Sequence, residues 1–200
     1  WGDPLWSVAP EFDQQTRGTG ESQELSFGDN NDGMSLFEVN GKSLLAVNNE
    51  YCNRKIIYGN RASGLPETPD DVRKGMAAHG VSIFEVAQKG RKWGIVKDSL
   101  YNRKITADTK VAIDGPAAGH PLLKTDEDQT GKLARGTFNN CGNGRTPWGT
   151  YLACEENFHG YFSSPSDPNA NLSADLKRYG VKTKDWGYNW VMNQDRFDVV

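Results

Sequence analysis

The sequence lacks any long run of apolar residues. The longest run, Leu44 to Val47, has four residues, whereas a membrane-spanning helix needs about 20. A cluster of Lys and Arg is also missing, and the net charge is -3 with a pI near 5.7. Because a basic patch is what attracts the phosphates of nucleic acids, we expect neither a membrane span nor a nucleic-acid partner.

Cysteine is scarce as well. The three cysteines, Cys52, Cys141 and Cys154, are an odd number, so at most one disulfide could form and at least one thiol stays free. A chain of 200 residues does not need disulfides to hold a core. The cysteine count therefore indicates neither an oxidising nor a reducing compartment. Because the chain begins at Trp1 and not at an initiator Met, we expect that a preceding segment has been removed.

Apolar residues are few and turn formers are many. Apolar residues make up 36% of the chain, mean hydropathy is -0.70, and there are 22 Gly and 9 Pro. A thin core with many turns favours short strands over long helices. The length predicts one domain, and the composition predicts an all-β fold.

Local signals place the first strands. Residues 11–24 form a turn-rich stretch without periodicity, which predicts a loop, and the GDNNDG stretch of residues 28–33 predicts a turn more readily than a cation loop. Asn40-Gly41 between two apolar runs is the strongest short hairpin signal and predicts strands over 35–39 and 43–51.

One helix and several further strands are expected downstream. Thr68 or Asp70 could cap a helix from Pro69 to Ala78, where His79 would end it as a cap or a packed side chain. Strands are expected over four segments, with the last two pairing with each other: residues 81–86, 92–99, 102–106 and 110–114. Residues 163–175 predict a loop insertion, and the aromatic residues 185–200 predict strand.

The stretch from Thr137 to Phe158 carries the most chemistry. Its ends read as strands around a turn, and polar side chains gather where the strands end: Asn139, Asn140, Cys141, Glu155 and Glu156. Adjacent carboxylates repel one another unless a cation or base neutralises them. Carboxylate oxygen suits calcium and a thiolate adds affinity for iron or zinc, so a mixed metal site is one reading. A solvated loop with an inert Cys is the other.

The same gradient from apolar to acidic residues ends the earlier hairpin, where Leu44 to Val47 pass into Asn48, Asn49 and Glu50. Strands that finish in carboxylates and amides would converge if they were inner strands of a β-propeller, whose blades each present one strand end to the central channel. No clean repeat of propeller period is visible.

Three classes of function fit these residues. The first is a metal-dependent hydrolase that uses Glu50, Cys141, Glu155 and Glu156. The second is a non-catalytic propeller that binds a partner and uses calcium for stability. The third is a thiol enzyme with Cys141 as nucleophile, which ranks last because the closest histidine in sequence, His159, is not an obvious base.

A series of phrases resembles a known family. LLAVNNEY, AAHGVSIFEV, NRKIT, GPAAGHPLL and GTFNNCGNGRTPWGTYLACEENF occur in the order and spacing of the PhoX-type alkaline phosphatases, with WGDPL at the start and GYNW near the end. The resemblance implies a six-bladed β-propeller that hydrolyses phosphate esters with calcium and iron at its channel, exported to the periplasm or beyond by a twin-arginine signal. Family members are much longer, so residues 1–200 are expected to form the N-terminal portion, roughly the first half, of one propeller domain that needs downstream blades.

The resemblance also assigns roles. It puts Cys141 in the place of an iron-binding thiolate, one or both of Glu155 and Glu156 among the metal ligands, and Glu50 in the place of the acidic residue of the family's NHEY segment, where this chain has Asn49 for the His. It implies that Cys52 and Cys154 are incidental.

Further polar residues complete the expected site. We expect them to support the metal ligands or to contact substrate: Asp32, Asn48, Asn49 and Asn140. The nucleophile is not assigned by the sequence, and the remaining ligands and any phosphate-clamping Arg would lie downstream.

Overall fold

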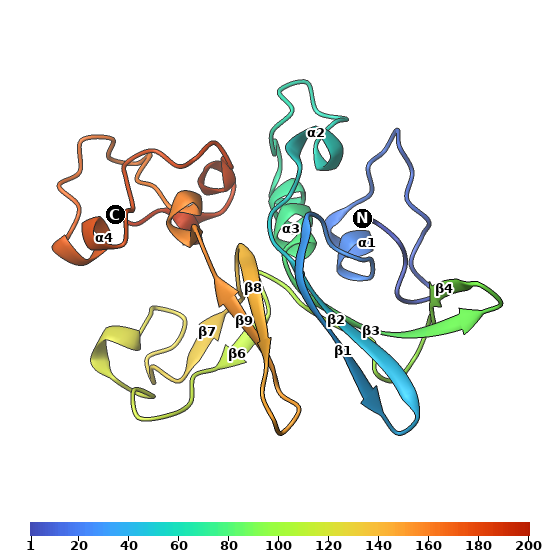
Figure 1. Cartoon of the computed structure of the whole chain (residues 1–200). Coiled ribbons are helices and arrows are strands. Elements are labelled where there is room, and N and C mark those ends of the chain that lie inside the picture. Colours follow the sequence, from blue (N-terminus) through green and yellow to red (C-terminus); the bar gives the residue numbers. More distant parts are fainter.

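The computed structural model describes all 200 residues and is mostly β. Its largest unit is a five-stranded antiparallel sheet in the order β1-β2-β3-β4, in which β5 also pairs with β3. The strands are β1 (Asn31–Val39), β2 (Lys42–Asn49), β3 (Gly80–Lys89), β4 (Lys92–Ile95) and β5 (Arg103–Ile105). Figure 1 shows this sheet on one side of the molecule, with helices gathered at the end where β2 finishes and β3 begins.

The hairpin expected around Asn40-Gly41 is confirmed. Both residues have positive φ, 52° and 73°, as the tight turn that matches the twist of the two strands requires. The turn expected over residues 28–33 is shorter than predicted, because β1 already begins at Asn31. The buried Asp29 carboxylate anchors this entry by accepting from the N–H groups of Asn30 and Asn53 at 2.8 and 2.6 Å.

The partner expected for residues 102–106 was wrong. β5 pairs with β3 through Val81 and Ile83, and β6 (Lys110–Ala112) pairs with β7 (Leu133–Arg135). β4 pairs with β3 only from Val86 to Lys89, so the edge of β3 at Val81 is open to another strand. Ile105 of β5 packs there against an apolar cluster that contains Val81. Closing this edge buries apolar surface that a local hairpin would leave exposed.

Helix α3 (Pro69–Ala78) forms as predicted, with Thr68 as N-cap and Asp71 completing a capping box. Three shorter helices were not expected: α1 (Gly20–Glu24), α2 (Arg54–Ile57) and α4 (Ala174–Arg178). The loop predicted over residues 11–24 therefore has to be corrected, since Thr19 caps α1. Helices of this length carry too few residues to show periodicity. None of the helices has the length and apolar character required to cross a membrane.

The prediction of strand over residues 185–200 was also wrong. Two 3-10 turns occupy this segment, η3 (Trp190–Met192) and η4 (Asp195–Phe197). Trp190 and Phe197 are fully buried in the main apolar cluster, which also holds Tyr58, Phe138 and Tyr161. Burying several large rings from a short segment favours tight turns over an extended strand, because a strand sends alternate side chains to opposite faces.

A second hairpin, β8 (Asn140–Arg145) and β9 (Tyr151–Glu155), lies beside β1 (Figure 1). Side chains join the two units. The amide of Asn143 donates to Ser35 Oγ at 2.8 Å, and Arg145 donates to the Leu36 carbonyl at 3.1 Å. The 3-10 turn η2 (Phe158–Tyr161) then leads from β9 into the aromatic core.

A lysine ties the helices to the sheet. The ammonium of Lys104 on β5 donates to the carbonyls of Gln23, Ser26 and Ala77 at 3.0, 2.7 and 2.5 Å. These carbonyls lie at or near the C-terminal ends of α1 and α3, where helix carbonyls need partners from outside the helix, and burial lowers the pKa of Lys104 to about 7. All three ammonium donors are thus used.

Candidate metal centre

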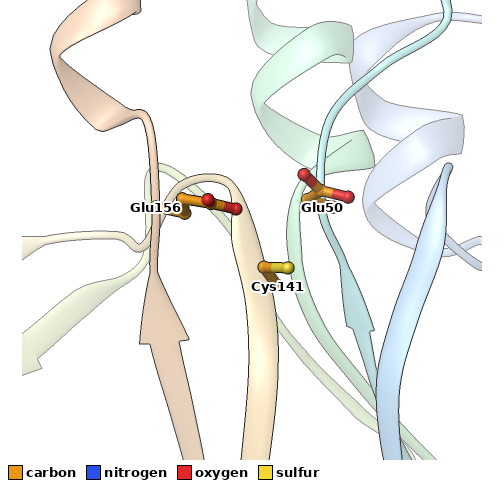
Figure 2. Close-up of side chains that lie close together, drawn as sticks. All are labelled: Glu50, Cys141 and Glu156. Carbon is orange, nitrogen blue, oxygen red and sulfur yellow. The ribbon is translucent and has the colours of Figure 1, made fainter.

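Three strand ends bring one thiol and two carboxylates together. Glu50 directly follows β2, Cys141 is the second residue of β8, and Glu156 directly follows β9. One ligand atom from each of the three side chains lies within 4.8 Å of the others. In Figure 2 Cys141 lies below and between the two glutamates, and the Glu156 carboxylate extends toward Glu50.

Backbone turns at asparagines aim these side chains. Glu50 N–H donates to the Asn30 carbonyl and Glu156 N–H to the Asn139 carbonyl, both at 3.0 Å. Asn30 and Asn139 have positive φ, 42° and 50°, which few residues other than Gly adopt as readily as Asn. The carbonyls of Asn30 and Asn139 therefore fix the backbone where the chain leaves β2 and β9.

Asp32 adds a third carboxylate next to Cys141. The thiol of Cys141 donates to Asp32 Oδ2 at 3.0 Å. The neighbouring carboxylates of Asp32 and Glu156 raise the pKa of Cys141 to about 12, because a thiolate beside carboxylates is repelled by their charge. This disfavours Cys141 as a free nucleophile, since reactive thiols have a lowered pKa.

Glu50 shows the same electrostatic conflict. Partial burial raises its pKa, and the charges of Asp32 and Glu156 raise it further. Like charges this close favour the protonated forms unless a cation lies between them. The donor set, two carboxylates and a thiol beside a third carboxylate, is the kind that binds a hard cation through oxygen and iron through sulfur.

The predicted supporting amides lie around this cluster. Asn48 Nδ2 donates to the carbonyls of Cys141 and Gly142 at 3.0 and 3.1 Å, so it holds β8 against the end of β2. Asn49 Nδ2 donates to Asn31 Oδ1 at 2.8 Å and holds the end of β1. Both asparagines are fully buried, and their hydrogen bonds hold the neighbouring strands in place around the site.

Two buried amide atoms near the start of β8 have no partner in the chain. Asn140 accepts from Thr137 Oγ1 at 2.6 Å through Oδ1, but its Nδ2 has no hydrogen-bond partner in the chain, and neither has Asn139 Oδ1. Unpaired polar atoms in such buried positions are rare. Asn140 lies opposite Glu155 in the hairpin, on the face turned away from Cys141, so its side chain is not one of those that face the cluster.

The structure separates the two adjacent glutamates. Glu155 is the last residue of β9, and its Oε1 accepts from the N–H of Phe138 at 3.0 Å. Neighbouring residues of an extended segment point to opposite sides, so only Glu156 faces Cys141 and Glu50. Of the four residues predicted as metal ligands, three are brought together and Glu155 is not among them.

Sequence reasoning missed a buried network behind the site. Tyr151 Oη lies 2.9 Å from Asn48 Oδ1. His79 Nδ1 bonds the Gly75 carbonyl at 2.7 Å, so this nitrogen carries the proton and Nε2 accepts from Tyr161 Oη at 2.8 Å. Tyr161 in turn accepts from Asn139 Nδ2 at 3.1 Å. His79 next to a helix end indicated only a packed side chain, and no local signal links it to Asn139.

Comparison with known proteins decides the family. A family model described as alkaline phosphatase PhoX matches residues 1–200. The chain belongs to the PhoX alkaline phosphatase family. The resemblance found in the sequence is thereby confirmed. A search of the curated proteins returned no match.

A solved PhoX structure is similar throughout this chain. It is described as Pseudomonas fluorescens PhoX in complex with vanadate, a transition state analogue, and it is 48% identical with a TM-score of 0.92. The match covers 99% of this chain and 34% of that one, so the chain spans about a third of the length of that PhoX chain.

Proposed function

We propose that these residues form part of a metal-dependent hydrolase of phosphate esters, with Glu50, Cys141 and Glu156 among the ligands of a calcium and iron cluster. The observation that carries the proposal is the convergence of one thiol and two carboxylates within 4.8 Å in a chain that matches the PhoX family over its whole length. The vanadate complex described for the Pseudomonas fluorescens protein supports it, because vanadate is named there as a transition state analogue and resembles phosphate in chemistry.

Cations held at this cluster would bind phosphate oxygens and neutralise the charge that builds up during hydrolysis. The residues of the chain prepare the site. Asp32 Oδ2 accepts a hydrogen bond from the Cys141 thiol, and it would be placed to take up that proton if the thiol bound a metal as thiolate. Asn48 clamps the backbone at Cys141, so the sulfur keeps its place between the carboxylates.

The resemblance supports three further parts of the proposal. The antiparallel order β1-β2-β3-β4 is the arrangement of a propeller blade, and we assign residues 1–200 to the N-terminal portion of a six-bladed ring. Blades outside these residues would supply the remaining ligands. A periplasmic or secreted destination follows from the same family.

The test compares two cysteines of the same hairpin. In the polypeptide of native length that carries these residues, Cys141→Ser should remove bound iron and lower hydrolysis of a chromogenic phosphate monoester by about 100-fold, the loss typical of a removed electrostatic stabiliser. Cys154→Ser, at an exposed position on β9, should change neither. Iron content is measured by elemental analysis. Iron and calcium bound without hydrolysis would instead favour a calcium-stabilised binding module.

A further inference from the structure

A cavity of about 450 Å³ has Tyr51 in its wall. Its walls come from two segments far apart in sequence, residues 51–55 after β2 and residues 186–188 before η3. Tyr51 directly follows Glu50. The cavity therefore adjoins the cluster, and its volume is within the range of small-molecule sites, about 300 to 1,000 Å³.

The aromatic walls of the cavity are fixed in place. Tyr188 stacks on the buried Tyr161 with ring centroids 4.0 Å apart. The Trp186 ring lies against Gly160, where an added Cβ would meet it at 2.6 Å, and its backbone N–H donates to the Gly160 carbonyl at 2.9 Å. Trp186 is nevertheless 51% exposed. A half-exposed ring held this firmly offers a flat surface that loses little entropy on binding.

The charges of the cavity differ in sign from those of the cluster. Arg54 and Lys55 line it, no carboxylate does, and neither cation takes part in an ion pair. Arg54 Nη1 donates to the Gly187 carbonyl at 2.6 Å, which joins the two walls and leaves the other guanidinium donors unused. Such a fork is suited to a carboxylate or phosphate.

We propose that this cavity is the subsite for the organic part of the phosphate ester, and that it takes a flat aromatic group carrying an anionic substituent. Trp186 and Tyr188 contact the ring, while Arg54 and Lys55 contact the substituent. The proposal rests on the proposed function, because it takes the Glu50 cluster as the place where the ester phosphate binds.

Two esters with nearly equal leaving groups test the charge preference. In 4-(carboxymethyl)phenyl phosphate a methylene separates the carboxylate from the ring, so its phenol differs little in acidity from that of 4-methylphenyl phosphate. For the native-length enzyme we expect kcat/KM to favour the carboxylated ester about tenfold, the effect of two charge contacts of under 1 kcal/mol each. In the Arg54→Gln/Lys55→Gln variant this ratio should fall to about 1. Gln at 54 keeps an N–H group for the Gly187 carbonyl.

A third ester, glycerol phosphate, tests the aromatic wall. Trp186→Leu should lower kcat/KM for both aryl esters about tenfold relative to glycerol phosphate, since aromatic contacts contribute about 0.5 to 1.5 kcal/mol beyond burial. Arg91→Gln, an exposed cation in the turn between β3 and β4, is the control and should leave all three rates unchanged.

The outcomes separate the subsite from the hydrolase. If the enzyme hydrolyses the aryl esters without preferring the carboxylated one, or if the preference survives in the double variant, the subsite is overturned while the proposed function stands. If the metal-loaded enzyme hydrolyses none of the three esters, the proposed function fails and the subsite with it.

Discussion

The buried histidine behind the site should make folding stability depend on pH in a defined window. His79 is fully buried, and burial lowers its pKa from the usual 6.5 to about 4. The neutral imidazole is also the form that the structure requires, because Nδ1–H donates to Gly75 and Nε2 accepts from Tyr161. Protonating Nε2 would leave two donors facing each other.

The sign of the effect follows from linkage. Above pH 6.5 the imidazole is neutral in both folded and unfolded chains, and His79 causes no pH dependence. As the pH is lowered from 6.5 to 4, the unfolded chain binds a proton that the folded chain does not. The free energy of unfolding therefore decreases as the pH falls through this window. The difference between 6.5 and about 4, at 1.36 kcal/mol per pKa unit, corresponds to a loss of about 3 kcal/mol.

The assay is urea unfolding at several pH values for the wild type and His79→Asn. Asn keeps a donor for the Gly75 carbonyl but leaves Tyr161 without an acceptor, so the variant should be less stable at pH 7.5 by about 2 kcal/mol. The variant lacks the His79 contribution to the pH dependence. When the pH is lowered from 6.5 to 4, its free energy of unfolding should therefore decrease by about 3 kcal/mol less than that of the wild type. His120→Asn, at an exposed histidine, should keep the wild-type pH dependence. Equal losses for wild type and His79→Asn would refute the assignment of a buried neutral imidazole.

The other predictions concern packing and the extent of the catalytic unit. Gly80→Ala should destabilise the sheet strongly in thermal unfolding, because Gly80 has φ +100° and a Cβ there would lie 1.9 Å from the Ile105 carbonyl oxygen; Gly94→Ala, whose Cβ meets nothing within 4 Å, is the control, and equal melting temperatures would contradict the reasoning. Lys104→Met should cost about 3 kcal/mol by leaving three carbonyls without their charged donor, whereas Lys92→Met at an exposed position should cost little in the same urea titration. Residues 1–200 alone should bind metal weakly and show negligible hydrolysis of a chromogenic monoester, while a polypeptide of the length of the solved relative should be active; comparable turnover by both would show that these residues hold a complete site.

The sequence by itself determined the features that depend on a few neighbouring residues. Asn40-Gly41 specifies a tight turn because both residues adopt positive φ easily, and Thr68 before Pro69 specifies the start of α3 through capping. The sequence also showed that polar residues follow the apolar part of β2 and gather at the ends of the hairpin that carries Cys141. It showed the family as well, because the family's motifs are runs of adjacent residues.

Only the tertiary structure decided which of these residues meet. Alternation along β9 requires Glu155 and Glu156 to face opposite sides, but the docking of the hairpin against β1 selects Glu156. The open edge of β3 selects β5 as its partner. Burial of Trp190 and Phe197 in the core favours tight turns in a segment whose sequence predicted a strand. These choices depend on surface buried between segments far apart in the chain, which no local pattern of residues encodes.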